Sequence, residues 1–431
     1  MIKKTVTILS IILALAGTGS AMAQDNLRLS LEEAQQYAEQ HNYTLQNASL
    51  DIRVNEAKRW QAIASMLPQI STGFDYQNMC GYELAFANTG MKIPMNPNGT
   101  FNIQAAIALT GAQIVSKGLT DIALSMSNIQ QKQNVQTVRS NVKKTYTSIL
   151  VMEETVSLLD SSLANMEQLM KSTQGAVDAG AVEQITADKL SVQVASLRNS
   201  LISTRRSLNV LYNSMVLLLG ADVDTKITLT TSVDELMDIE KIAQIGQRQF
   251  NIEQNYDYML LTESEKVSKK QILLAKMNAT PTVSAYYQYS YKTYFGRDAG
   301  MNMTPPNVIG ISISQPLFKS GSVLSQVKAA KLSYQETLNS KRQAEDGLKV
   351  QYNQLCYDLA SAIDSYRTQK DNIEVSKRVF DNTLEKYKYG MATNVDVTNS
   401  STDIITAQSN YIQAVLSVIN AQVALENMMT E

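Results

Sequence analysis

Apolar residues recur at alternating steps of three and four along four long segments of the chain. This spacing puts them on one stripe of a helix and is typical of coiled coils. The predicted helices are residues 118–174, 181–219, 322–388 and 392–429. At 1.5 Å per residue, the first and third would be roughly 85 and 100 Å long. Helices of that length predict an extended tube, although any single stripe also fits the core of an ordinary helix bundle.

Two further segments, 31–66 and 246–279, are amphipathic with a less regular period. The helices at 181–219 and 392–429 are much shorter than the long helices that precede them. We therefore expect the two amphipathic segments to stack end to end on these return helices, so that two short helices lie along each long one.

Four shorter segments, 68–77, 101–110, 281–292 and 307–318, alternate apolar and polar residues with a period of two. Such alternation predicts strands with one apolar face, and about 10 residues is the length of a tilted outer-membrane strand. Tyrosines 76, 286, 289 and 291 suit an aromatic girdle at the membrane interface. The Gly-, Pro- and Asn-rich loops 79–100 and 293–306 would then face outside the cell. A half-buried sheet on a soluble domain remains the alternative.

The N-terminus has the organisation of a secretory signal. Lys3 and Lys4 precede an apolar run at residues 6–16, and Ala21-Met22-Ala23 matches a small-residue cleavage site. We predict a signal peptide at residues 1–23, with an uncleaved membrane anchor as the alternative. No later stretch approaches the ~18 consecutive apolar residues of a spanning helix.

The order of predicted elements occurs twice, at residues 24–219 and 246–431, with residues 220–245 between them. Each repeat is predicted to contain a helix, two strands joined by a loop, a long helix, a tight tip and a return helix. The tip sequence at residues 179–185 is echoed at 389–395, with a glycine second in each. Glycine is expected there, because the residue beyond a helix C-terminus often needs a positive φ.

Composition excludes several classes of function. The 38 Lys and Arg against 40 Asp and Glu argue against nucleic acid as a partner. His41 is the single histidine, which excludes a multi-histidine metal site, and Cys80 and Cys356 cannot make a disulfide framework. No catalytic or phosphate-binding motif is present. We expect no enzyme activity, no cofactor and no metal.

The strands predict an oligomer if they lie in a membrane. The smallest outer-membrane barrels have about eight strands, and an open sheet edge is not tolerated in lipid. One chain supplies only the four predicted strands. Three copies would supply twelve, so the hypothesis is a homotrimer.

The ordered set of these elements, with the tip motif Tyr387-x-x-Gly390 followed by Val395-Asp396, resembles the TolC-like outer-membrane efflux proteins. The resemblance covers nearly the whole mature chain. It implies a mainly α fold with membrane β structure: long coiled-coil hairpins forming an α-barrel in the periplasm, and four strands per chain in a trimeric twelve-stranded β-barrel. Residues 220–245 would form an equatorial band. The implied function is an outer-membrane exit duct for efflux or type I secretion.

The resemblance also implies partners: outer-membrane lipid, a periplasmic membrane-fusion adaptor and an inner-membrane pump of the RND or ABC type. Adaptor docking would fall on the helix tips. The tip residues concerned are Gly180, Ala181, Val182, Gly390, Met391 and Ala392. The competing hypothesis is an exported periplasmic coiled-coil scaffold without pore activity.

The same resemblance places a periplasmic gate just beyond the second tip. Asp396 matches the first gate aspartate, whereas Asn399 occupies the second position and weakens the expected ring of charge. Tyr387 matches a residue that tethers the gate to the first repeat, where the corresponding position is Thr186. The alternative is that Asp396 and Thr186 are simply exposed residues at helix starts.

Overall fold

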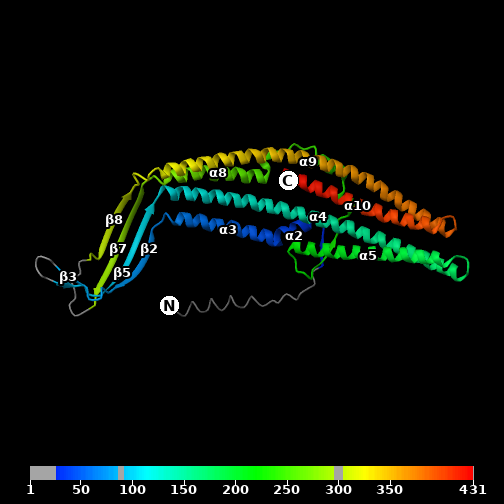
Figure 1. Ribbon diagram of the computed structural model, residues 1–431, viewed down its shortest axis with the longest axis horizontal. Coiled ribbons are helices and arrows are strands. Elements are labelled where there is room, and N and C mark those ends of the chain that lie inside the picture. Colours follow the sequence, from blue (N-terminus) through cyan, green and yellow to red (C-terminus); the bar gives the residue numbers. More distant parts are fainter. Residues whose placement is uncertain (1–25, 86–91, 296–303, 431) are drawn as a thin grey trace, which may run out of the picture. The chain divides into compact units, whose positions relative to one another are not determined.

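The computed structural model describes residues 26–85, 92–295 and 304–430 (Figure 1). The predicted signal peptide at 1–23 lies outside the described residues, as do parts of the predicted loops 79–100 and 293–306. The chain forms two compact units, each built from both halves of the sequence. Unit 1 comprises Met1–Gln46, Asn134–Asn251 and Val350–Glu431, and unit 2 comprises Asn47–Gln133 and Ile252–Lys349.

The four long helices are present. Helices α4 (Gly111–Asp178) and α9 (Ser322–Lys388) have 68 and 67 residues, and the return helices α5 (Gln184–Leu219) and α10 (Asn394–Met429) have 36 each. Helix α9 has the predicted bounds. Helix α4 begins earlier than predicted, because Thr110 and Gln113 cap its start. The Thr110 Oγ1 accepts from the Gln113 amide at 3.2 Å, and the Gln113 side chain accepts from the Thr110 amide at 2.8 Å.

The predicted helix 31–66 is in fact two helices, α2 (Leu31–His41) and α3 (Tyr43–Ala64). The break lies at Asn42, whose backbone is extended. Its side-chain Nδ2 donates to the Leu218 carbonyl at 2.7 Å, and its Oδ1 accepts from the Thr44 amide at 2.8 Å. Asparagine thus ends one helix and opens the next, as expected for a residue that competes with helical hydrogen bonds.

The predicted helix 246–279 is likewise shorter than expected. A 3₁₀ turn at Ile252–Gln254 precedes α8 (Tyr256–Met277). Asn255 caps α8, since its Oδ1 accepts from the Tyr258 amide at 3.2 Å.

Unit 2 contains a four-stranded antiparallel sheet in the order β2-β5-β7-β8 (Figure 1). The strands are β2 (Gln69–Gln77), β5 (Asn98–Leu109), β7 (Thr282–Tyr294) and β8 (Asn307–Ser314). The central pair, β5 with β7, joins the two halves of the chain, so that β2 and β8 are the edges. A short hairpin that the sequence did not predict, β3 (Glu83–Ala85) with β4 (Lys92–Pro94), lies within the loop 79–100.

The sheet has one apolar and one polar face, as predicted. Apolar side chains stay largely exposed on the first face, from 68% to 82% for Ile70, Phe74, Ile309, Ile311 and Ile313. Side chains hydrogen-bond on the other face: Asn102 Oδ1 accepts from the Ser290 hydroxyl at 2.7 Å, and Asn102 Nδ2 donates to Asp75 at 3.4 Å.

The placement of Tyr286 in the aromatic girdle was wrong. Its register partners are Ala106 and Gly310, and it lies on the polar face with Gln288 and Ser290. Residues of a strand alternate between faces, so Tyr289 and Tyr291 point the other way.

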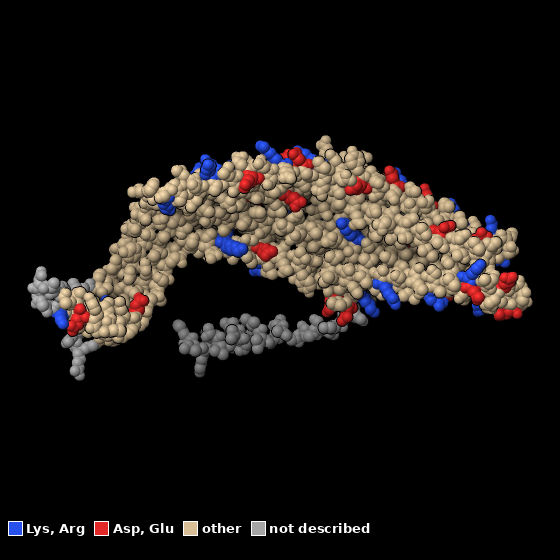
Figure 2. Space-filling model, in the orientation of Figure 1, with Lys and Arg blue, Asp and Glu red and all other residues tan. Residues whose placement is uncertain are grey.

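Charged residues are sparse on these four strands, where Asp75 and Lys292 are the charged positions and both lie on the polar face. Figure 2 shows the strand region almost free of Lys, Arg, Asp and Glu, whereas the helices carry both signs scattered over the visible face. An uncharged, exposed apolar face predicts contact with lipid or protein rather than with water.

Unit 1 is held by apolar clusters between helices. The cluster nearest the tips joins α4, α5, α9 and α10 through Met166, Leu190, Leu197, Phe380 and Val397, all nearly inaccessible to solvent. The predicted coiled-coil stripes therefore meet in one shared core. No helix in the described ranges combines the length and the apolar composition needed to cross a lipid bilayer.

The segment 220–245 packs beside α4 in unit 1. It contains β6 (Lys226–Leu229), α6 (Val233–Leu236) and α7 (Ile239–Ile245), and β6 pairs in parallel with β1 (Asn26–Leu29). The fully buried Tyr146 of α4 donates its hydroxyl hydrogen to the Leu29 carbonyl at 2.9 Å. The same oxygen accepts from the amides of Thr230 and Thr231 at 3.2 and 3.0 Å. One side chain thus fastens this strand pair to the long helix.

Candidate functional site

The two helix tips are built by the same turn. After α4, Gly180 has φ +75°, its amide donates to the Val177 carbonyl, and Ala181 donates to Ala176 at 2.9 Å. After α9, Gly390 has φ +72° and the matching bonds run to Tyr387 and from Met391 to Lys386 at 2.8 Å. Both are Schellman motifs, in which glycine supplies the positive φ. The two similar tip sequences therefore form the same structure.

The return helices begin differently. Thr393 caps α10, and the Asp396 carboxylate accepts from the Thr393 amide at 2.8 Å and from the Thr393 hydroxyl at 2.6 Å. These hydrogen bonds hold the pKa of Asp396 below its ordinary value. Glu183 occupies the N-cap position of α5, as Thr393 does in α10, but its side chain makes no capping hydrogen bond. Asp396 is exposed, so it presents a full negative charge at neutral pH while stabilising the helix start.

Asn399 lies three residues beyond Asp396 in α10 and is also exposed. Positions i and i+3 share a helix face, so the two side chains point the same way. The two residues proposed for the gate thus lie together on one surface of α10.

Tyr387 and Thr186 are both half-buried. Tyr387 packs against the tip core. The hydrogen bond that reaches Thr186 from the second half of the chain comes instead from Asn394, whose Nδ2 donates to the Thr186 carbonyl at 2.8 Å. Sequence reasoning missed Asn394. The signal for it was its position as the first residue of the return helix α10.

A second polar contact joins α5 to α10. Gln193 Nε2 donates to the Ser401 hydroxyl at 2.9 Å, and both residues are buried. Buried polar groups are costly unless they find a partner, so this bond specifies how the two return helices align. Together with Asn394 and Thr186, it connects the two hairpins near their tips.

A groove of about 820 Å³ lies between α4 and α9 beside the tips. It is lined by four of the predicted residues, Val182, Tyr387, Gly390 and Ala392. Met391 at 70% and Val182 at 36% are exposed apolar side chains at the same end. The tips therefore offer an open apolar surface next to a groove.

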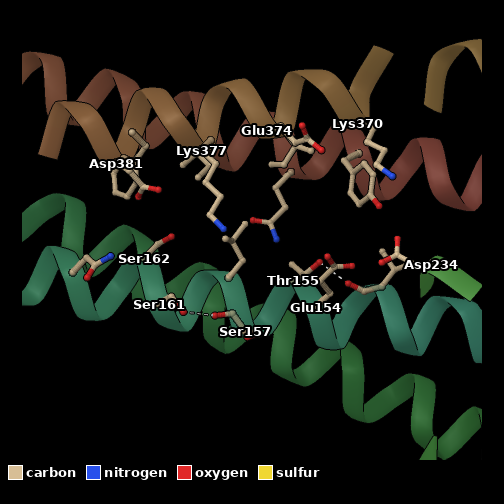
Figure 3. Close-up of a pocket in the computed structure, with 18 residues that line it drawn as sticks. Glu154, Thr155, Ser157, Ser161, Ser162, Asp234, Lys370, Glu374, Lys377 and Asp381 are labelled. Carbon is tan, nitrogen blue, oxygen red and sulfur yellow. Dashed lines mark hydrogen bonds between the residues drawn. The ribbon is translucent and has the colours of Figure 1, made fainter. Parts of the chain in front are cut away.

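A neighbouring groove of about 850 Å³ continues along the same two helices and shares Asn165 and Asp381 with the first. Figure 3 shows Lys370 and Lys377 of α9 on one side, Glu154 and the serines of α4 on the other, and Asp234 from α6 at one end. The lining is polar and carries both charge signs. Within the described ranges, no group of three or more His, Cys, Asp or Glu side chains could hold a metal ion.

Glu154 is the carboxyl group of this groove whose pKa is shifted from its ordinary value. Loss of surrounding water raises its pKa above the ordinary value of 4.5, the nearby Asp234 charge raises it further, and Lys370 acts in the opposite direction. A raised carboxyl pKa means that the folded state disfavours the charged form.

Replacing Glu154 with Gln should therefore stabilise unit 1 at neutral pH. The folded state binds the Glu154 proton more tightly than the unfolded chain does. The contribution of Glu154 to the free energy of unfolding is therefore largest below the ordinary carboxyl pKa, and it is lost as the pH rises through the raised pKa of the folded state. Thermal unfolding of wild type and Glu154→Gln should diverge with rising pH and coincide in acid. An equal difference at every pH would contradict this origin. Glu153→Gln provides the control on the adjacent carboxylate, which accepts a hydrogen bond from the Tyr212 hydroxyl.

A family model described as "Outer membrane efflux protein" matches residues 264–431. Over 97% of this chain, the sequence is 21% identical to the outer membrane protein TolC of Escherichia coli, and the match covers 88% of that protein. A 24% identity to the outer membrane efflux protein BepC of Brucella suis covers 37% of this chain and 34% of BepC, about a third of its length.

Solved channel structures share the fold. The chain superposes over 93% of its length on the Campylobacter jejuni CmeC outer membrane channel, covering 85% of it, with a TM-score of 0.74 and 14% identity. It superposes equally far on the open state of the Neisseria gonorrhoeae MtrE outer membrane channel, covering 88% of it, with a TM-score of 0.71 and 16% identity.

The chain is thus similar to the TolC-like outer-membrane efflux proteins, in its second half by the family model and along nearly its whole length by sequence and fold. This similarity confirms the resemblance drawn from the tip motif and the order of elements. The matching family model is described as an outer membrane efflux protein, and the superposed structures are outer membrane channels.

Proposed function

We propose that this protein is the passive exit duct of a tripartite efflux or type I secretion system, and that it works as a homotrimer. In this proposal the sheets of three chains close a twelve-stranded barrel in lipid, and the paired hairpins of three chains enclose the periplasmic tunnel.

The observation that carries the proposal is the sheet of unit 2. Its apolar face is 70% to 82% exposed at Ile309, Ile311 and Ile313 on the edge strand β8, and the other edge, β2, exposes Ile70 to 78%. A sheet with two open edges and an unprotected apolar face is unstable in both water and lipid. Pairing β8 of one chain with β2 of the next removes the edges and turns every apolar face to lipid.

Two experiments separate this duct from an exported scaffold. The purified protein should migrate as a heat-modifiable trimer in detergent, fractionate with the outer membrane and conduct ions in a planar bilayer. A monomer released in soluble form by osmotic shock would favour the scaffold instead.

The tips are proposed as both gate and docking surface. Asp396 and Asn399 share one face of α10, and threefold symmetry would repeat their side chains around the tunnel end. Asn394 and Thr186, with Gln193 and Ser401, hold the two hairpins of a chain together. The Asn394–Thr186 contact is part-buried and the Gln193–Ser401 contact is buried, so a gate movement that separates the hairpins has to break both.

Charge at the proposed gate can be changed in both directions. Asp396→Asn removes the carboxylate while keeping an oxygen that can still cap α10, and Asn399→Asp adds a second carboxylate. Block of the pore by hexamminecobalt(III) should weaken about tenfold in the first variant and strengthen in the second, since tenfold is roughly 1.4 kcal/mol of binding free energy. Single-channel recording measures both. Block that is identical in the two variants would remove Asp396 and Asn399 from the gate.

The adaptor and pump are proposed on family resemblance together with the tip geometry. Two glycine turns with exposed apolar side chains lie beside the open groove, where another helical hairpin could pack; their residues are Gly180, Ala181, Val182, Gly390, Met391 and Ala392. A pump of the RND or ABC type would supply the energy. Cysteine cross-linking from residue 182 or 391 to a co-expressed periplasmic adaptor tests the docking surface, and exposed Val192 of α5, outside the tips, gives the control position.

A further inference from the structure

Tyr286 is a large aromatic side chain on the polar face of the sheet, where its neighbours are small or polar. It pairs with Ala106 on β5 and with Gly310 on β8. The next pairs along this face are Gln288 with Gln104 and Val308, and Ser284 with Ala108 and Ser312. The aromatic ring therefore lies in a gap between small residues instead of filling an apolar core.

The position of the ring is fixed by Gly310. A Cβ added to Gly310 would lie 2.6 Å from Cε1 and Cζ of Tyr286 and 2.8 Å from its hydroxyl oxygen. The ring edge bearing the hydroxyl thus covers the bare backbone of β8, an arrangement by which aromatic side chains compensate for a glycine in a strand. The ring is only partly buried in this position, so part of its surface stays accessible.

We propose that the outer face of Tyr286 is a contact site for aromatic and organic-cation solutes in the channel. The proposal rests on the duct function above, in which the polar face lines the lumen. Three copies of the ring would form an aromatic belt in a wall that is mostly small and polar, with Val308 and Tyr294 as its other large or apolar side chains.

The same face already holds a cation over an aromatic ring. Lys292 Nζ lies 5.0 Å from the ring centroid of Tyr294, and both residues are on the polar face with Tyr286. The ring's negative π-face attracts cations, and aromatic solutes stack on it. The wall elsewhere offers hydrogen bonds from Asn102, Gln288 and Ser290, which suit small polar solutes.

The probe is tetraphenylphosphonium, which is both aromatic and cationic, added to single trimeric pores in a planar bilayer. Brief blockades by the probe should shorten about fivefold in Tyr286→Ala, the size expected for loss of a modest cation–π contact. Tyr286→Phe keeps the ring and should keep the blockades. Gly310→Ala keeps tyrosine at position 286, but the added Cβ displaces its ring from the β8 backbone. This variant should shorten the blockades as well.

Tyr289→Ala is the matched control, because this residue lies on the opposite, apolar face of the same strand. Blockade times that are equal in wild type and Tyr286→Ala overturn the inference, as does a wild-type pore that shows no blockade by the probe. Either result leaves the duct function intact, since ions still pass. A protein that forms no pore refutes the duct function, and with it the lumenal contact site.

Discussion

Replacing Ile311 with arginine is expected to abolish assembly into the outer membrane. Ile311 is 77% exposed on the apolar face of the edge strand β8, opposite Ala285. An arginine facing lipid near the middle of a membrane strand costs about 2–4 kcal/mol per chain, and a trimer bears that cost three times. The heat-modifiable oligomer should disappear from outer-membrane fractions.

Ser312→Arg is the control for this prediction. Ser312 is the next residue of β8 and lies on the polar face, opposite Ser284. A charge there would meet a water-filled lumen, so the oligomer should form normally. If both arginine variants assemble equally well, the apolar face does not contact lipid.

Tyr146→Phe is expected to loosen the strand pair β1 and β6 from α4. The substitution removes one hydroxyl that serves three backbone groups, those of Leu29, Thr230 and Thr231. The Leu29 carbonyl and the Thr230 amide still bond to each other at 3.2 Å, so the half-buried Thr231 amide is the group that loses its partner, at a cost of about 1–3 kcal/mol. Hydrogen–deuterium exchange at residues 26–31 and 226–232 should accelerate accordingly.

Tyr212→Phe gives the comparison for Tyr146. The Tyr212 hydroxyl donates to the Glu153 carboxylate, a group in contact with solvent. Water can take over that hydrogen bond, and exchange in the β1–β6 pair should not change. Acceleration of equal size in both variants would show that loss of general packing, and not the three backbone contacts of Tyr146, governs the exchange.

Local patterns were sufficient for most elements. The spacing of apolar residues predicted the four long helices, and α9 from Ser322 to Lys388 has the predicted bounds. The two tip glycines predicted turns that the structure shows as a matching pair at Gly180 and Gly390. These features depend on residues within one or two helical turns of each other, so the sequence contains the information.

Errors arose where a partner distant in the sequence decides the structure. The break between α2 and α3 depends on the bond from Asn42 to the Leu218 carbonyl, which no local pattern shows. The contact from Asn394 to the Thr186 carbonyl was missed for the same reason. The placement of Tyr286 in the aromatic girdle was a different kind of error, because the alternation along its own strand already put this residue on the polar face.

The sequence by itself determined the periodicities, the two repeats and the tip turns, because helix and strand faces follow from the spacing of side chains along the backbone. Tertiary structure alone decided that β5 pairs with β7, that Tyr146 holds a strand pair, and that Gln193 meets Ser401. The physical reason is that these contacts join segments up to about two hundred residues apart, and their free energy appears only when the chain brings them together.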